Sequence, residues 1–283
     1  MSNSLTFGDR MKEYYERPAS TYLPRRTNTI IRLDGVGFSK FTRGLDRPYD
    51  TSFVDAMNET AAALCKAIQG AKCAFVQSDE ISILLTDYDT NDTSAWFGGN
   101  TQKITSVAAG MATAHFNRAF THKNKNMPGF FDARVFTVPF AEEVVNCFLW
   151  RQQDCTRNSV SMLAQQLYSH KELHGKDVSM MQSLIYDKRD ELRPMLTNAG
   201  ILTLEEASKP NLDWSDLPAG LKRGRFITRK TLLVNDALHG EYTRNKWVAE
   251  GAPMFNTNRE AILALLPGYM TDEEEEDITL INS

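Results

Sequence analysis

The order of strands and helices along the first half of the sequence predicts an α+β fold with a ferredoxin-like (βαββαβ) core. Apolar runs of strand length occupy four segments, 28–34, 72–77, 80–86 and 133–139. Apolar residues recur with a helical period in two further segments, 51–69 and 100–121. This order is the split βαβ pattern, in which the third strand lies between the first and the second, and the first two run parallel.

Each of these elements has a sequence signal for where it ends. The first strand stops at Gly35, and the helix after it stops at Gly70. The second and third strands are separated only by Ser78 and Asp79, which predicts a hairpin whose turn lacks the favoured glycine. The fourth strand ends at Pro139, which cannot donate to a sheet. Residues 1–140 are therefore expected to form the core.

The second half of the sequence predicts an extension packed on this core, at 141–270, within the same compact domain. Residues 141–168 and 178–198 have helical patterns, 224–234 is a β run, and 258–266 is a short helix after a loop at 251–253. Asp272 to Asp277 are six consecutive acids, which is typical of a solvated, mobile tail, so 271–283 is predicted to be disordered.

Composition narrows the class of protein. The chain has 283 residues, of which 42% are apolar and 24% charged, as in soluble globular proteins. The net charge of −4 argues against a protein that binds nucleic acid non-specifically over its whole surface, although local basic clusters remain. The sequence has no long apolar run and no apolar stretch at its start, so we expect no membrane span and a cytoplasmic location. Its four cysteines lack Cys-x-x-Cys spacing, which makes zinc and disulfides unexpected.

Three acids are expected to meet at one edge of the sheet. In the predicted topology Asp34 ends the first strand, close to Asp79 and Glu80 of the hairpin. Carboxylates packed together repel one another unless a cation lies between them. Oxygen ligands without histidine or cysteine suit Mg²⁺, and two such ions can activate a hydroxyl and neutralise a leaving phosphate. Gly35 allows a tight turn that offers its backbone to a ligand. Asp34-Gly35 alone would more often be an ordinary turn.

Two further stretches are candidates for binding. The Gly-Val-Gly-Phe-Ser stretch at 35–39 follows the first strand, and its amides could cradle a triphosphate, with Arg43 and Arg47 downstream. Arg151, Asp154, Asn158 and Ser161 share one helical face. That face is either a set of ion pairs in solvent or a covered polar surface that contacts RNA or a nucleotide.

Several motifs, in order, resemble those of the tRNA-His guanylyltransferase family. They are Arg32-Leu33-Asp34-Gly35 with Arg47-Pro48 and Asp50, then Gln77-Ser78-Asp79-Glu80, Phe131-Asp132-Ala133-Arg134-Val135, Trp150-Arg151-Gln152 with Asp154, and Lys222-Arg223-Gly224. The resemblance runs from about residue 7 to 235. It implies a polymerase-palm-like catalytic core, a homotetramer, and addition of nucleotides in the 3′-to-5′ direction to the 5′ end of tRNA, activated by a nucleoside triphosphate such as GTP or ATP.

The resemblance also implies roles for individual residues. Asp34, Gly35 and Asp79 are expected to hold two Mg²⁺ ions, with Glu80 a further acid needed for activity. The triphosphate is expected at 34–39, which includes Val36, Gly37, Phe38 and Ser39, and at Arg47, Asp50, Ser78 and Asp79. RNA contacts are expected from Arg134, Arg151, Asp154, Arg157, Asn158, Lys222 and Arg223.

One motif departs from the eukaryotic pattern. Where eukaryotic members have His-Ile-Asn-Asn, this sequence has Thr156-Arg157-Asn158-Ser159, which resembles the bacterial, archaeal and phage branch of guanylyltransferase-like proteins. That branch implies template-directed repair of tRNA 5′ ends instead of strict guanylylation of tRNA-His. The residues alone leave two alternatives open, a palm-type nucleotidyl cyclase and a non-catalytic tRNA-binding protein.

Overall fold

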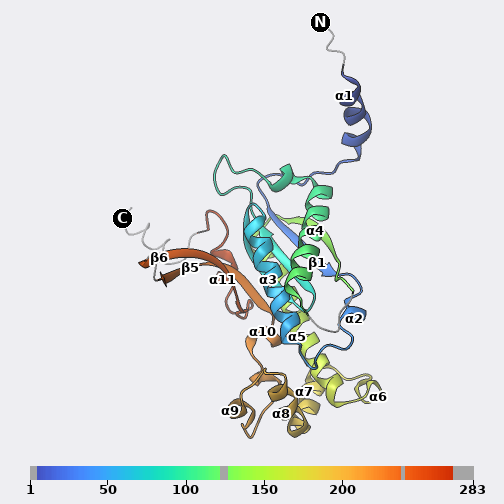
Figure 1. The fold of residues 1–283 in the computed structure, drawn as a ribbon, viewed down its shortest axis with the longest axis vertical. Coiled ribbons are helices and arrows are strands. Elements are labelled where there is room, and N and C mark those ends of the chain that lie inside the picture. The colour runs from blue at the N-terminus through green and yellow to red at the C-terminus, as the bar shows by residue number, and fades with distance from the viewer. Residues whose placement is uncertain (1–4, 122–126, 237–239, 270–283) are drawn as a thin grey trace.

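A single antiparallel sheet forms the centre of the molecule. A computed structural model describes residues 5–121, 127–236 and 240–269. Six strands are hydrogen-bonded in the order β4-β1-β3-β2-β5-β6 (Figure 1). Their bounds are Asn28–Gly35 for β1, Ala71–Gln77 for β2, Glu80–Leu85 for β3, Phe131–Val138 for β4, Arg225–Asp236 for β5 and Gly240–Gly251 for β6.

Three long helices, α3 at Thr51–Ala67, α4 at Thr101–Ala119 and α5 at Ala141–Leu167, pack on this sheet. The shorter α-helices are α1 (Phe7–Met11), α2 (Phe38–Phe41), α6 (His170–Leu173), α7 (Val178–Asp187), α8 (Arg189–Asn198), α9 (Leu204–Ala207), α10 (Ala219–Lys222) and α11 (Glu260–Leu263). A π-helical turn, Lys12–Glu16, follows α1, and 3₁₀ turns lie at Arg17–Ala19, Trp96–Gly99 and Trp214–Asp216.

The βαββαβ order that the sequence predicted is confirmed. Strand β3 pairs antiparallel with both β1 and β2, so β1 and β2 run parallel on either side of it. Strand β4 pairs with the other edge of β1. Strands β5 and β6 extend the sheet beyond β2, so the second half of the chain adds to the sheet of the first half.

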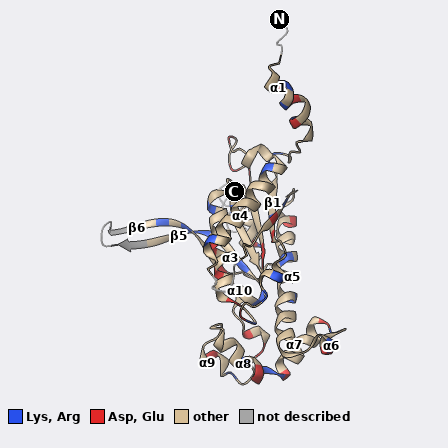
Figure 2. Ribbon diagram, turned by 45° about the vertical axis from the view of Figure 1, so that its right-hand side comes forward, with Lys and Arg blue, Asp and Glu red and all other residues tan. Residues whose placement is uncertain are grey.

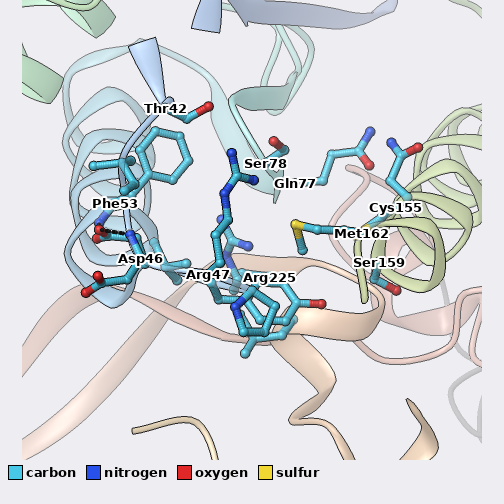
Figure 3. A pocket seen from close by; sticks show the side chains of 17 residues that line it. Thr42, Asp46, Arg47, Phe53, Gln77, Ser78, Cys155, Ser159, Met162 and Arg225 are labelled. Atoms are coloured by element: carbon cyan, nitrogen blue, oxygen red, sulfur yellow. Dashed lines mark hydrogen bonds between the residues drawn. The ribbon is translucent and has the colours of Figure 1, made fainter. Parts of the chain in front are cut away.

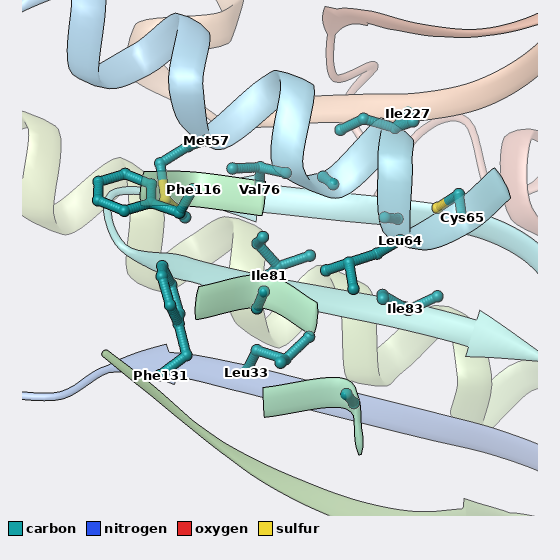
Figure 4. Packing of buried hydrophobic residues seen from close by; sticks show 14 of the residues in the cluster. Leu33, Met57, Leu64, Cys65, Val76, Ile81, Ile83, Phe116, Phe131 and Ile227 are labelled. Atoms are coloured by element: carbon teal, nitrogen blue, oxygen red, sulfur yellow. The ribbon is translucent and has the colours of Figure 1, made fainter. Parts of the chain in front are cut away.

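The sheet buries a different set of side chains on each face. On one face, Leu33, Ile81, Ile83 and Val76 pack against α3 and α4 in a cluster that also contains Phe116 (Figure 4). Because side chains alternate along a strand, their neighbours point to the other face. There Ile30, Leu84 and Phe75 pack against Phe148 of α5 and residues of α11.

Helix α5 connects this second core to a smaller helical cluster. Its first half packs on the sheet, and its second half packs against α7, α8 and α9 through Leu163 and Leu167. The helix is therefore anchored at both ends (Figure 1). Its middle turns, around Arg151 to Ser159, pass the end of the sheet where β1 stops and β2 turns into β3.

The structure differs from the sequence predictions in the second half of the chain. Strand β6 was not predicted, because its residues are mostly polar and show no apolar alternation. The expected helix at 178–198 is two helices separated at Lys188. The β5–β6 hairpin stands away from the body, so its outer residues lack the one-sided burial that produces an alternating pattern (Figure 2).

Two further expectations concern the chain as a whole. Across the described ranges, no helix is both long enough and apolar enough to cross a bilayer. The predicted acidic tail at 271–283 lies outside the described residues.

Candidate active site

Asp34, Gly35 and Asp79 meet at the end of the sheet. Asp34 is the second-to-last residue of β1 and is paired in register with Glu80, and Asp79 lies in the tight turn between β2 and β3. A Cβ atom added to Gly35 would lie 2.8 Å from Oδ2 of Asp79 and 2.4 Å from the Phe38 ring. The Asp79 carboxylate therefore lies directly against the Gly35 backbone, in a space that only glycine leaves open.

The charge environment of Asp79 is unfavourable for an isolated carboxylate. Burial raises the pKa of Asp79, and the neighbouring carboxylates of Asp34 and Glu80 raise it further, against hydrogen bonds from its own amide and from the Ser78 side chain. A bound cation would relieve this repulsion. Among the described residues, no three His, Cys, Asp or Glu side chains converge as a metal site. The donor set that fits is thus two carboxylates with the Gly35 backbone.

Glu80 is not available as a third carboxylate ligand because Arg151 of α5 holds it. Arg151 donates from Nε to Oε1 of Glu80 at 2.8 Å and from Nη2 to Oε2 at 2.7 Å. The same Nη2 lies 2.8 Å from Oδ2 of Asp154. The carboxylate of Glu80 accepts a hydrogen bond from Ser82 as well, at 3.2 Å. A bidentate arginine contact of this kind fixes a carboxylate in position.

The polar face of α5 is both a set of ion pairs and a partly covered surface, which were the two alternatives that the sequence left open. It is a set of ion pairs, since Arg157 lies 3.0 Å from Asp154 and Asn158 donates to Asp154 at 3.5 Å. It is also covered at one end, because Arg151 is only 9% exposed. Ser161 lies further along and donates to the sulfur of Met181.

The stretch at 35–39 offers its backbone, not its side chains. Gly37 has a φ of 69° and precedes α2, so the first amides of that helix, including those of Phe38 and Ser39, have no acceptor within it. The amide of Val36 donates instead to the Phe130 carbonyl at 2.8 Å. The ring of Phe38 is buried against the rings of Phe116 and Phe131 and so anchors residues 35–39.

Two adjoining cavities open at this point. One, of about 370 Å³, is lined by Asp34, Asp79 and the polar face of α5; we call it the acidic cavity. The other, of about 290 Å³, lies between the 42–54 segment, α5 and the start of β5 (Figure 3); we call it the side cavity. Gln77, Ser78 and Asn158 line both, so one elongated ligand could occupy the two cavities together.

Arg47 and Asp50, both expected at the nucleotide, line the side cavity in different ways. Arg47 is exposed, and Figure 3 shows its side chain extending across the cavity towards the Ser78 side. Asp50 is buried and caps α3, accepting from the Phe53 amide at 3.0 Å and the Ser52 hydroxyl at 2.5 Å. Its other oxygen accepts from the Asp46 amide at 3.2 Å, so Asp50 joins the 46–50 loop to the start of α3.

The remaining expected RNA contacts differ in exposure, since Arg134 is exposed and Lys222 and Arg223 are partly buried. Arg134 of β4 is half-exposed, 3.7 Å from Asp132. Lys222 donates to the Ser215 carbonyl and lies over the Trp214 ring. Arg223 donates to the Ala252 carbonyl at 3.0 Å.

Sequence reasoning missed several residues of the site. Tyr49 and Arg225 line the side cavity, and Gln77 lines both cavities, but none was singled out for its chemistry. Trp150 is half-exposed at the acidic cavity, and the guanidinium carbons of Arg32 and Arg151 lie 5.5 Å and 4.5 Å from its ring centroid. The available signal was Gln77, a polar residue directly after the apolar run Cys73 to Val76 of β2.

Several known proteins are similar to this chain in sequence and fold. A sequence model of the family described as tRNAHis guanylyltransferase matches residues 8–139. A bacterial tRNA(His) guanylyltransferase (Thg1)-like protein solved in complex with ATP is 35% identical, with a TM-score of 0.72, covering 92% of this chain and 99% of the other. A structure with the same description in complex with GTP is 34% identical, with a TM-score of 0.69, covering 91% and 97%.

A curated relative agrees with these matches. The probable tRNA(His) guanylyltransferase of Dictyostelium discoideum is 26% identical over 207 residues, which are 71% of this chain and 75% of the relative. The palm-like fold, the paired carboxylates and these matches lead to one conclusion: the chain belongs to the tRNA(His) guanylyltransferase family of nucleotidyltransferases.

Proposed function

We propose that this protein adds nucleotides in the 3′-to-5′ direction to the 5′ end of tRNA, as a repair enzyme guided by the opposite strand. The observation that carries the proposal is the contact of Asp79 with the Gly35 backbone beside Asp34, at the junction of two cavities. The bacterial relatives solved with ATP and GTP support a nucleoside triphosphate as the substrate that fills them.

Asp34, the Gly35 carbonyl and Asp79 would hold two Mg²⁺ ions. Bound there, such ions supply charge neutralisation at the phosphates and a more acidic attacking hydroxyl. The chain itself orients the reactants. Ser78 and the amides at 37–39 receive the triphosphate, and Arg47 approaches it from the side cavity. Arg151 holds the Glu80 carboxylate in position through two hydrogen bonds. This division leaves no metal-binding role for Glu80.

The tRNA would lie over the surface outside the acidic cavity. Asn158 lines that cavity, Arg134 is paired in register with the lining residue Arg32, and Arg157 pairs with the lining residue Asp154. Lys222 and Arg223 are further candidates for tRNA contacts and donate to the Ser215 and Ala252 carbonyls in this structure. Arg151 and Asp154 act instead from inside, by positioning Glu80 and Arg157. We further propose a homotetramer in the cytoplasm, as the resemblance and the sequence predict.

The test uses tRNA transcripts that lack their first 5′ nucleotide. Labelled triphosphates are added singly with Mg²⁺, and the growing end is mapped. We expect label at the 5′ end, matched to the base opposite. Asp34→Asn and Asp79→Asn should each lower the rate about 1000-fold, since ion contacts supply several kcal/mol and 1.36 kcal/mol is a factor of ten.

The matched control is Asp132→Asn. Asp132 lies opposite Asp34 on β4, but its side chain is half-exposed and pairs only with Arg134 at 3.7 Å. Because exposed ion pairs contribute little, the labelling rate of this variant should stay within about threefold of the parent's rate. Retained activity in both Asp34 and Asp79 variants, or a cyclic nucleotide formed without RNA, would overturn the proposal.

A further inference from the structure

The face of the sheet that α5 covers changes in character from one row of side chains to the next. Three register pairs of β1 and β4 follow one another there, two residues apart: Ile30 with Phe136, Arg32 with Arg134, and Asp34 with Asp132. Side chains two residues apart on a strand point to the same face. The first pair belongs to the second core. An apolar row is therefore followed by an arginine row and then by a carboxylate row at the active site.

The arginine row places two like charges side by side. Register partners on antiparallel strands have Cβ atoms about 4.5–5.5 Å apart, and like charges at that distance are destabilising. Among the described residues Arg32 has no ion-pair partner, and Arg134 lies 3.7 Å from Asp132 with both side chains half-exposed. A phosphate between the two guanidinium groups would remove the repulsion, and its oxygens match their hydrogen-bond donors.

Trp150 of α5 presents an open ring beside this row. It lines the acidic cavity together with Arg32, whose guanidinium carbon lies 5.5 Å from the ring centroid. Trp150 is 49% exposed, so much of its ring lacks the burial that usually stabilises such a side chain. Arg151 lies against the ring at 4.5 Å and is itself held by Glu80 and Asp154. The ring is therefore supported by the protein and still accessible to a ligand.

An aromatic ring beside cations is the combination that binds nucleic-acid strands. Bases stack on aromatic side chains whatever their identity, while arginines contact the backbone phosphates. A contact that tolerates every base suits an enzyme whose added nucleotide is specified by the opposite strand. The arginine row also lies only about 6–7 Å from the carboxylate row, because it is two residues away along each strand. A strand that ends at Asp34 and Asp79 would pass over it.

We infer that Trp150, Arg32 and Arg134 hold the 5′-terminal nucleotide of the tRNA, with its base stacked on the indole. The reacting 5′ phosphate lies at the carboxylate row, and the next phosphate of the strand lies between the two arginines. The inference rests on the proposed function and names three positioning residues for it. The resemblance implied an RNA contact for Arg134, but it implied none for Arg32 or Trp150.

The test is equilibrium binding of the full chain to a tRNA transcript that lacks its first 5′ nucleotide, over a series of salt concentrations. A second transcript carries an abasic residue at its 5′ end, so it keeps the phosphates and loses the base. Thermal unfolding of each variant checks that binding is measured on folded protein.

The variants separate stacking from phosphate contacts. The ring is tested with Trp150→Leu and Trp150→Phe, and Phe140→Leu is the control, because Phe140 is exposed at the N-cap of the same helix. The cations are tested with Arg32→Met, Arg32→Lys and Arg134→Met, and Lys171→Met is the control, because Lys171 is an exposed cation on α6.

We expect Trp150→Leu to weaken binding of the first transcript about 10-fold, as for one stacked base. It should weaken the abasic transcript less than about twofold and leave the salt dependence unchanged, whereas Trp150→Phe should stay within about threefold of the parent. Arg32→Met and Arg134→Met should each lower the slope of log affinity against log salt by about 1 on both transcripts. Arg32→Lys should keep the parent's slope because it keeps the charge. The two controls should change nothing.

Two outcomes would overturn the inference. Equal losses on the two transcripts for Trp150→Leu would show that the indole shapes α5 without stacking on a base. An unchanged salt slope in both Arg32→Met and Arg134→Met would show that no phosphate lies between these arginines. A parent protein that binds neither transcript would contradict the proposed function itself, and that result is distinct because it appears before any substitution is made.

Discussion

Arg151 and Glu80 lie 71 residues apart in sequence and form a bidentate ion pair, with both side chains only 11% exposed. The pair joins the middle of α5 to the start of β3, one residue beyond Asp79. It sets Glu80 apart from the two other acids at this end of the sheet, because the Glu80 carboxylate is paired with Arg151. The carboxylates of Asp34 and Asp79 are left for a cation.

Breaking this pair should affect stability and activity differently. Arg151→Met leaves Glu80 as a buried, uncompensated charge, so unfolding should become easier by about 3–5 kcal/mol. The double variant Arg151→Met/Glu80→Gln removes both charges and should regain most of that stability. Its activity should stay low, because the position of Glu80 beside Asp79 is lost. Chemical denaturation and the tRNA labelling assay measure the two effects separately.

The control for this experiment is Arg157→Met. Arg157 also pairs with Asp154, but its side chain is 52% exposed, so its loss should cost under about 1 kcal/mol. A double variant no more stable than Arg151→Met would show that the pair is not what stabilises this part of the fold.

Asp154 should make stability depend on acid pH. Burial alone would raise its pKa, but hydrogen bonds and charges from Arg157 and Arg151 outweigh burial and lower it below 3.8. A lowered carboxyl pKa adds stability above the unfolded value, and that stability is lost as pH falls through the folded value. Unfolding followed from pH 6 down to pH 2 should show this loss in the parent and a smaller one in Asp154→Asn. Parallel curves would contradict the assignment.

Gly35 should tolerate no side chain. The methyl group of Gly35→Ala would meet both the Phe38 ring and the Asp79 carboxylate, and crowding of this kind costs about 1–3 kcal/mol. Because Asp79 must move, Mg²⁺-dependent labelling should also fall more than stability predicts. Gly110→Ala is the control: it lies in α4 with no atom within 4 Å of an added Cβ, so it should be neutral or stabilising by up to about 1 kcal/mol. Equal effects of the two substitutions would refute the argument.

The sequence predicted the core of the fold well because local patterns determine it. The central strands β2 and β3 are short apolar runs buried on both faces, and helices α3 and α4 each bury one regular face. The order of such elements restricts the topology to a few choices. The meeting of Asp34 with Asp79 follows directly from that topology. Strand β6 was not predicted because pairing with β5 stabilises it, not a local apolar pattern. Polar residues fit such a hairpin as well as apolar ones.

The parts of the site that were missed depend on contacts between distant segments. Tyr49 comes from the loop before α3, Gln77 from β2 and Arg225 from β5, and only the folded chain brings them to one cavity. Arg151 could be placed on the polar face of α5 from its spacing, but its inward direction depends on how α5 crosses the sheet. Gln152, beside it, binds the amide of Phe255 and the carbonyl of Pro253, a contact across about a hundred residues that no spacing rule predicts.

Ser78, in the turn between β2 and β3, combines a strained backbone with a hydrogen bond to Asp79. Ser78 has a φ of 44°, in the left-handed region, which costs a residue with a side chain about 1–2 kcal/mol. Glycine is favoured at such a position in a two-residue hairpin loop. The serine is retained, we argue, because its hydroxyl donates to Asp79 and helps to keep that carboxyl ionised.

Two substitutions separate strain from hydrogen bonding. Ser78→Ala removes the hydroxyl and keeps the strain, whereas Ser78→Gly removes both. The glycine variant should therefore be more stable than the alanine variant by about 1 kcal/mol, while both should need more Mg²⁺ for half-maximal labelling than the parent. If the alanine variant were the more stable, the backbone at Ser78 would not be strained. If both kept the parent's Mg²⁺ requirement, the Ser78 hydroxyl would not help to position Asp79 for the ion. The serine in this turn would then need an explanation other than the metal site.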